Sequence, residues 1–128
     1  MGKYLLDSFA LIEYLEGTET GEKVKEIIQK EQNEILISAI SVSEILSKVL
    51  RQNLDKEKTK KIILSLGKII DVNIEIAELA SEIHAQMKKK INDFGLADAL
   101  ILASTKLNNA KLVTGDKHFK DMKDIVFL

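Results

Sequence analysis

Residues 96–116 read LADALILASTKLNNAKLVTGD, an apolar helical pattern followed at once by a short apolar strand pattern. The pattern predicts a helix over 96–107 and a strand over 111–114, which ends just before Asp116. Other short apolar strands are predicted at residues 3–7, 34–38, 68–72 and 125–128. Helices between strands that are apolar throughout are typical of an α/β fold with a central, mainly parallel sheet.

Further helical patterns separate the predicted strands. They cover residues 8–15, 21–31, 41–50, 55–66 and 74–89. Ser8 is expected to cap the first of these helices, and Gly17 is expected to end it. Ser41 and Glu44 have the spacing of a capping box, which predicts that the third helix begins at Ser41.

Length and composition predict a single globular domain over residues 1–128. Hydrophobic residues make up 45% of the chain and charged residues 30%, as is usual for a soluble protein. No apolar run is long enough for a membrane span, and no basic leader or signal core precedes the first strand. The absence of cysteine excludes disulfides and thiolate metal sites. We therefore expect a cytoplasmic protein.

The charge balance gives no general signal for nucleic-acid binding, because the net charge is −1. Of the 19 basic residues only Arg51 is an arginine, which argues against recognition through several bidentate guanidinium contacts. An enzyme with an acidic site nevertheless needs only a local positive rim to hold a nucleic acid. Composition alone therefore neither predicts nor excludes nucleic-acid binding.

Four acids stand where a carboxylate needs a special explanation: Asp7, Glu44, Asp98 and Asp116. Asp7 ends one apolar strand pattern, Asp116 follows another, and Asp98 is the one charged residue in the apolar stretch 96–103. A buried carboxylate is costly unless it is paired, hydrogen-bonded or bound to a cation. Two carboxylates about 4 Å apart repel by roughly 4 kcal/mol at an effective dielectric constant near 20.

A hard divalent cation would stabilise the four acids if the fold brings them together. Ligand sites of open parallel sheets lie beyond the carboxyl ends of the strands, which is where Asp7 and Asp116 are predicted. Glu44 and Asp98 would complete the cluster if their helices begin at the same edge. The four acids therefore predict a site for Mg²⁺ or Mn²⁺ and metal-assisted phosphodiester chemistry.

Each acid also has a purely structural interpretation. Asp7 fits a helix N-cap, although Ser8 beside it would serve as a cap too. Glu44 fits a capping box, Asp98 fits the favourable charge at a helix start, and Asp116 fits an ordinary turn. Spacing alone does not decide between these interpretations and a shared site.

The two histidines, His84 and His118, are not spaced as ligands of one site. For both, a hydrogen-bonded or solvent-facing side chain is a more common explanation than a catalytic base. Asp93, Asp121 and Asp124 are interpreted as loop acids. None of these residues enters the predicted site.

Four stretches of the chain together resemble the PIN-domain nucleases, and among them the VapC toxins of VapBC toxin–antitoxin pairs. The sequences LLDS, SEI, LADALI and LVTGDKHF carry the resemblance, at residues 5–8, 43–45, 96–101 and 112–119. The resemblance covers nearly the whole chain. It depends on the order and spacing of all four acids, because any one stretch alone is a weak signal.

The resemblance implies a three-layer α/β/α PIN-like domain with a central parallel sheet. It also implies Mg²⁺- or Mn²⁺-dependent cleavage of RNA that leaves 5′-phosphate and 3′-hydroxyl ends. The four acids match the catalytic and metal-binding positions, and Ser8 and Thr114 match supporting positions. A homodimer and a VapB-like antitoxin partner are implied as well.

The four acids are expected to have different roles, with Asp7 and Asp98 binding the principal ion directly. Glu44 would complete the ion's shell or orient the attacking water, and Asp116 would assist a second ion or an outer water. A phosphatase with an aspartate nucleophile is disfavoured, because Phe9 stands where its second acid is needed. The alternative function is a PIN-like RNA- or protein-binding module with little or no nuclease activity, which the scarcity of arginine leaves open.

Two further expectations concern contacts with other chains. Apolar residues in 35–50 and 62–70 exceed what one small domain easily covers, which with the resemblance predicts a symmetric homodimer. The antitoxin is expected to insert an arginine or lysine among Asp7, Glu44 and Asp98, in place of the metal.

Overall fold

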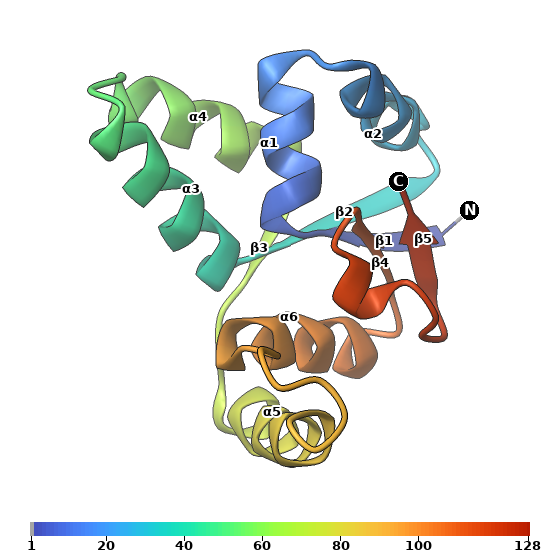
Figure 1. Cartoon of the computed structure of the whole chain (residues 1–128). Coiled ribbons are helices and arrows are strands. Elements are labelled where there is room, and N and C mark those ends of the chain that lie inside the picture. The colour runs from blue at the N-terminus through green and yellow to red at the C-terminus, as the bar shows by residue number, and fades with distance from the viewer. Residues whose placement is uncertain (1) are drawn as a thin grey trace.

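The computed structural model describes residues 2–128 and is built around a five-stranded sheet (Figure 1). Its strands are β1 (Gly2–Leu6), β2 (Asn33–Ser38), β3 (Lys68–Ile70), β4 (Lys111–Thr114) and β5 (Ile125–Phe127). They lie in the order β3-β2-β1-β4-β5, and each neighbouring pair is parallel. The sheet expected to be mainly parallel is therefore parallel throughout the described residues.

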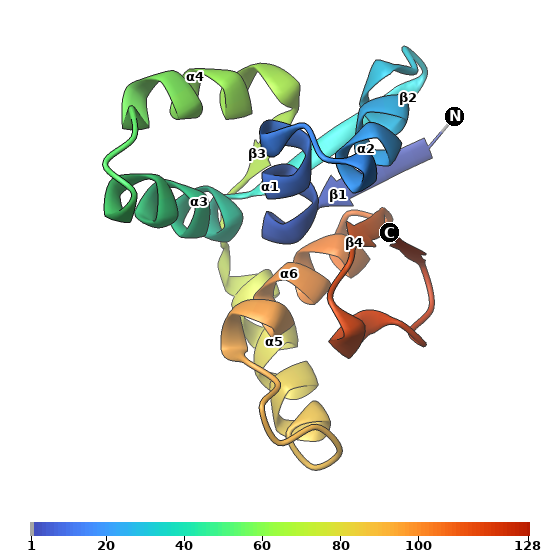
Figure 2. The same ribbon diagram turned by 45° about the horizontal axis from the view of Figure 1, so that its top comes forward.

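Helices cover both faces of this sheet (Figures 1 and 2). One face carries α1 (Ser8–Glu16), α2 (Glu19–Gln29), α3 (Ala39–Arg51) and α4 (Lys56–Leu66). The other face carries α5 (Ile74–Met87) and α6 (Leu96–Leu107), and a short 3₁₀ turn, η1 (Lys117–Phe119), follows β4. This is the expected three-layer α/β/α arrangement. Among the described residues, no helix combines the length and the apolar character needed to cross a membrane.

The central strands supply two separate cores, because successive residues of a strand point to opposite faces of the sheet. Leu5 and Leu112 pack with residues of α5 and α6, whereas Leu6 and Val113 pack with residues of α1 and its neighbours. All four side chains are fully buried. Because helices cover both faces, these strands are apolar throughout instead of alternating with polar residues.

Two phenylalanines join the loop before α6 to the segment after β4. The rings of Phe94 and Phe119 are buried and meet edge to face, with centroids 6.0 Å apart and an interplanar angle of 76°. Such pairs stabilise a structure beyond the area they bury. The contact fixes the start of α6 beside η1, and so it sets the distance between the acids that these two segments carry.

Helices α2 and α3 each begin two residues earlier than the sequence pattern predicts. Thr18 caps α2, since its side chain accepts a hydrogen bond from the Gly21 N–H at 3.0 Å. Ser38 caps α3 in the same way, through the Ile40 N–H at 3.1 Å. Gly21 therefore lies inside α2, where a Cβ would overlap the backbone of Glu13, so glycine permits the close contact between α2 and α1.

Candidate metal centre

All four acids line one cavity of about 370 Å³ at the carboxyl edge of the sheet. The other lining residues are Ser8, Phe9, Ile101, Gly115, Lys117 and Phe119. The predicted convergence of the four acids is therefore present in the structure.

The cavity lies where the strand order changes direction. After β1 the chain adds β2 and β3 on one side, and it then returns to place β4 and β5 on the other. Ligand sites of open parallel sheets form at such switch points, outside the carboxyl ends of the strands. Asp7 directly follows β1, and Asp116 follows β4 by two residues, so the topology itself brings these two acids together.

Asp7 is both the N-cap of α1 and a member of the cluster. Its Oδ1 accepts a hydrogen bond from the Ala10 N–H at 2.9 Å, and its side chain is 7% exposed. The prediction that Ser8 caps α1 is wrong, because Ser8 is already helical and its hydroxyl donates to Glu44 instead. A carboxylate has lone pairs for about four partners, so the cap leaves room for a cation.

The surroundings of Asp7 destabilise its ionised form. The pKa of Asp7 is raised from 3.8 to about 6, mainly by burial and also by the nearby carboxylates of Asp116 and Asp98. Hydrogen bonds from the Thr114 side chain and the Ala10 N–H act in the opposite direction. A buried acid that is ionised at neutral pH under these conditions gains stability from any cation that binds beside it.

Glu44 lies in the second turn of α3 and takes no part in a capping box. The interpretation of Ser41 and Glu44 as a helix start is wrong, because α3 begins directly after β2 and Ser38 has already capped it. Ser41 is buried inside the helix. The Glu44 Oε1 accepts a hydrogen bond from the Ser8 hydroxyl, which ties α3 to the start of α1 at the cavity.

Asp98 belongs to the first turn of α6. Its Oδ2 accepts a hydrogen bond from the Gly95 N–H at 3.3 Å, which is half of a capping box, since glycine has no side chain to complete it. Burial raises the pKa of Asp98, and the carboxylates of Asp116 and Glu44 add to the rise, while the Gly95 N–H and His118 lower it. Asp98 therefore faces two other acids as well as favouring the helix start.

Asp116 likewise combines a turn role with a place in the cluster. Its Oδ1 accepts from the His118 N–H at 2.9 Å, and its own N–H donates to the Thr114 hydroxyl at 3.0 Å. Thr114 is fully buried at the end of β4. The turn interpretation of Asp116 is therefore correct but incomplete, because the same turn directs the carboxylate into the cavity.

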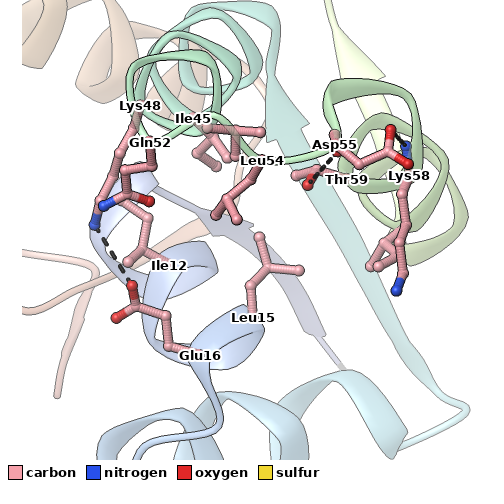
Figure 3. Close-up of a pocket in the computed structure, with 12 residues that line it drawn as sticks. Ile12, Leu15, Glu16, Ile45, Lys48, Gln52, Leu54, Asp55, Lys58 and Thr59 are labelled. Atoms are coloured by element: carbon pink, nitrogen blue, oxygen red, sulfur yellow. Dashed lines mark hydrogen bonds and ion pairs between the residues drawn. The ribbon is translucent and has the colours of Figure 1, made fainter.

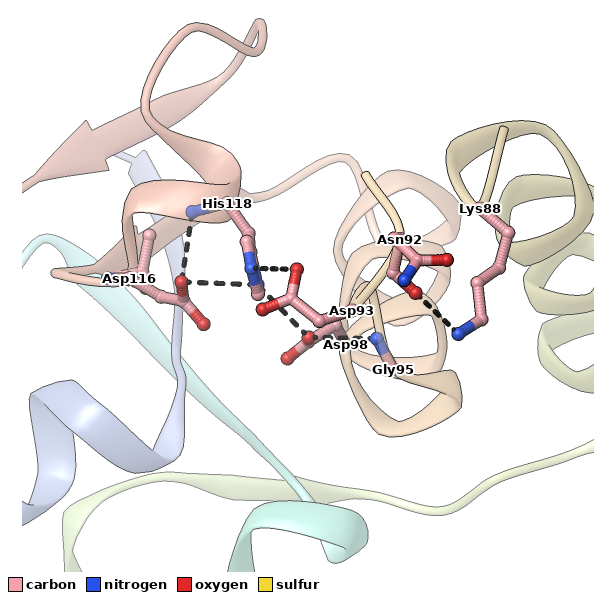
Figure 4. A network of polar contacts seen from close by, with 8 residues as sticks. Lys88, Asn92, Asp93, Gly95, Asp98, Asp116 and His118 are labelled. Atoms are coloured by element: carbon pink, nitrogen blue, oxygen red, sulfur yellow. Dashed lines mark hydrogen bonds and ion pairs between the residues drawn. The ribbon is translucent and has the colours of Figure 1, made fainter. Parts of the chain in front are cut away.

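Sequence reasoning left His118 out of the site, whereas the structure places its ring among the acids (Figure 4). Nε2 lies 3.1 Å from Asp93 Oδ1, and Nδ1 lies 3.4 Å from Asp116 Oδ1 and 3.7 Å from Asp98 Oδ2. Asp93, interpreted as a loop acid, thus contacts the site through His118. The signal in the sequence was the position of His118 two residues after Asp116, inside the same tight turn.

The residues of this cluster fit a divalent cation. One ligand atom each from Asp98, Asp116 and His118 lie within 4.8 Å of one another, and Asp7 and Glu44 line the same cavity. The His118 Nδ1 is buried without a hydrogen-bond partner, as expected of a nitrogen that binds a metal ion. The carboxylate oxygens of this cluster suit hard ions such as Mg²⁺ and Mn²⁺.

A second cavity lies between α1, α3 and α4 and differs in character (Figure 3). Its apolar wall includes Ile12, Leu15, Ile45, Leu54 and Ile62. The two acids in its lining are already engaged: one pairs with Lys48 at 3.6 Å, and the other caps α4. We describe it as an apolar groove, because its lining offers no group of free metal ligands.

Solved structures similar to this chain include toxin–antitoxin proteins. A toxin–antitoxin complex from Klebsiella pneumoniae is 25% identical, with a TM-score of 0.77 over 96% of this chain and 95% of that chain. VapBC2 from Rickettsia felis, bound to a promoter DNA fragment, is 21% identical, with a TM-score of 0.76 over 98% and 97%. A sarcin-ricin loop cleaving toxin from Mycobacterium tuberculosis is 14% identical, with a TM-score of 0.73 over 94% and 95%.

The comparison with curated protein sequences gives no match. The comparison with protein families matches residues 4–125 to the PIN domain, and the match runs from within β1 to the first residue of β5. The match includes all four acids and His118. With the parallel sheet, the strand order and the acidic cavity in agreement, the chain belongs to the PIN domain family.

Proposed function

We propose that this protein is a Mg²⁺- or Mn²⁺-dependent endoribonuclease, the VapC-like toxin of a toxin–antitoxin pair acting in the cytoplasm. The observation that carries the proposal is the convergence of the four acids on one cavity at the switch point of the sheet, with His118 grouped beside Asp98 and Asp116. Toxins and toxin–antitoxin complexes among the similar structures support it, and one of those toxins is described as cleaving the sarcin-ricin loop.

The chain's own side chains would divide the chemistry among them. Asp7 and Asp98 would hold the principal ion, with the Asp7 carboxylate fixed by its cap contact to the Ala10 N–H. Glu44, held by the Ser8 hydroxyl, would orient the attacking water and accept its proton. A bound divalent ion would lower the pKa of that water and stabilise charge on the phosphoryl oxygens. Hydrolysis would leave 5′-phosphate and 3′-hydroxyl ends.

The test of this function is metal-dependent cleavage. Purified protein, incubated with a panel of structured and single-stranded RNAs, should cut in the presence of Mg²⁺ or Mn²⁺ and stop when EDTA is added. Mapping of the product ends should find a 5′-phosphate on the downstream fragment. RNA that is retained in a gel-shift assay but never cut with either ion would instead favour the binding-module alternative.

The mouth of the cavity offers contacts for RNA. Phe9 is 41% exposed there, and its ring lies so close to Gly115 that a Cβ at that position would overlap it. Lys117 lines the same cavity, and Arg51 shares a neighbouring hollow with Glu44. An exposed aromatic ring in a cavity that also carries a cationic side chain suits stacking on a base beside a cleaved phosphate.

Phe9→Ala should therefore weaken the binding of RNA by about tenfold, because one stacked base contributes about 1–3 kcal/mol. The KM for a short RNA substrate should rise while kcat changes little. Phe127→Ala is the matched control, since Phe127 on β5 is 40% exposed and is not part of the cavity lining. Equal KM values for the two variants would show that Phe9 is not part of the RNA-binding surface.

The antitoxin partner would act at the same acids. Its tail would place an arginine or lysine among Asp7, Glu44 and Asp98, where a guanidinium can bind two carboxylate oxygens at once. The affinity of the partner should then fall as the Mg²⁺ concentration rises, since the two compete. Titration calorimetry with a cognate antitoxin peptide measures this, and an affinity independent of Mg²⁺ would place the inhibitory contact elsewhere.

A symmetric homodimer is also proposed. Exposed apolar residues gather on α3, on α4 and on the loop between them: Leu50, Leu54, Ile62 and Leu64 are 37–59% exposed. Apolar patches of this kind mark interfaces between protein chains. Sedimentation equilibrium should give twice the mass of the 14.4 kDa chain. A monomer at high micromolar concentration would reject the dimer, and Leu54→Lys should shift a true dimer toward monomer.

A further inference from the structure

The ring of His118 carries a feature that a purely carboxylate site does not explain. Its Nδ1 is fully buried and has no hydrogen-bond partner, yet it points between Asp98 and Asp116 (Figure 4). The distances of 3.7 Å and 3.4 Å to their oxygens exceed the usual 2.7–3.2 Å of an N–H···O hydrogen bond. The nitrogen is therefore close to two carboxylates without being bonded to either.

These separations lie within the range found between two ligands of one six-coordinate cation, about 3.0–4.2 Å for bonds of about 2.1 Å. Two donors on adjacent positions of a six-coordinate ion lie about 3 Å apart when each bond is about 2.1 Å. The ligand atoms of Asp98, Asp116 and His118 all lie within 4.8 Å of one another. Movement of the three side chains toward a common point would bring all three atoms onto a shared ion.

The other ring nitrogen is already held. Nε2 lies 3.1 Å from Asp93 Oδ1, and the ring packs 6.1 Å from the buried ring of Phe94. A neutral imidazole has one N–H, so donation from Nε2 to Asp93 leaves a lone pair on Nδ1. A lone pair facing two carboxylates is repulsive unless a cation lies between them. A carboxylate on the far nitrogen is also the usual partner of a metal-binding histidine.

We propose that His118 is a nitrogen ligand of the divalent ion, through Nδ1, and that Asp93 is its positioning residue. This inference rests on the proposed metal site and specifies its chemistry. Imidazole suits transition metals, whereas Mg²⁺ favours oxygen ligands. The set of Asp98, Asp116 and His118 therefore prefers Mn²⁺ to Mg²⁺, and His118 is the origin of that preference.

Electron spin-echo spectroscopy of the Mn²⁺-loaded protein detects the ligand directly, because a coordinated imidazole nitrogen modulates the echo of the ion. The chain has two histidines, which makes the assignment simple. The nitrogen modulation should be present in wild type and in His84→Gln, and absent from His118→Gln. His84 is the matched control, since it lies on α5 and is not grouped with Asp98 and Asp116.

Titration calorimetry gives the second readout. His118→Gln should weaken Mn²⁺ binding by tenfold or more and leave Mg²⁺ binding within about twofold, and Asp93→Asn should weaken Mn²⁺ binding by about tenfold. One outcome would overturn this inference while supporting the carboxylate site. In it, wild type binds Mn²⁺ without nitrogen modulation, and Mn²⁺ binding is lost in Asp98→Asn but kept in His118→Gln. Wild type that binds neither ion at millimolar concentration would overturn the proposed function itself.

Discussion

An Asp98→Asn variant should lose RNA cleavage by a factor of about 10²–10³. The substitution removes one of the two carboxylates proposed to hold the principal ion, and a bound metal ion contributes several kcal/mol to stabilising the transition state. Each 1.36 kcal/mol corresponds to a factor of ten in rate. The fold should survive, because the asparagine side-chain oxygen still accepts from the Gly95 N–H and the repulsion from Asp116 is removed.

The measurement is single-turnover cleavage of a short RNA in saturating Mn²⁺, with circular dichroism to confirm the fold. Asp71→Asn is the control, because Asp71 is an exposed acid after β3 and does not line the cavity. That variant should cleave at the wild-type rate. Wild-type cleavage by Asp98→Asn, from a preparation free of contaminating nuclease, would remove Asp98 from the site.

An Asp7→Asn variant should be more stable than wild type at neutral pH in the absence of metal. The folded protein holds the pKa of Asp7 at about 6, above the ordinary 3.8, so folding favours the protonated acid. Below pH 4 the acid is protonated in both the folded and unfolded states, and it adds no penalty. As the pH rises from about 4 to 6 the penalty grows to about 3 kcal/mol, at 1.36 kcal/mol for each pH unit.

Asparagine avoids this penalty because it has no charge, and it caps a helix as well as aspartate does, so the contact with the Ala10 N–H remains. Urea unfolding in EDTA, compared at pH 4 and pH 7.5, measures the effect. The gain in unfolding free energy of the variant over wild type should be near zero at the lower pH and reach about 2–3 kcal/mol at the higher pH. Added Mn²⁺ should then stabilise wild type and not the variant. A gain that is equal at the two pH values would contradict the effect of burial on Asp7.

Much of the fold is local and was therefore predictable. The strands are apolar throughout because helices cover both faces of the sheet, and that pattern persists in any short window of sequence. The boundaries of α6 and β4 agree residue for residue with the predicted 96–107 and 111–114. The errors include two helix caps, since Asp7 caps α1 in place of Ser8 and Ser38 caps α3 in place of Ser41. They also include element ends: β3 ends at Ile70 and α5 at Met87, each two residues before the predicted end.

The candidate site shows the limit of local signals. Asp98 was identifiable because its neighbours are apolar, and Asp7 because it ends a strand. Glu44 looked like half of a capping box until the structure showed that its partner is Ser8, 36 residues earlier in the chain. Asp116 looked like a turn residue, and it is one, but that turn also lies at the switch point of the sheet.

By itself the sequence determined the fold class and singled out Asp7 and Asp98, because hydrophobic period and isolated charge are properties of neighbouring residues. Glu44 and Asp116 joined them only through the resemblance to PIN-domain nucleases. Only the tertiary structure decided that His118 belongs with them. Its Nε2 meets Asp93, 25 residues away, and its Nδ1 faces Asp98 because buried Phe94 and Phe119 hold the start of α6 against η1. A contact that depends on aromatic packing between distant segments has no period or spacing in the sequence, so it becomes visible only when the chain is folded.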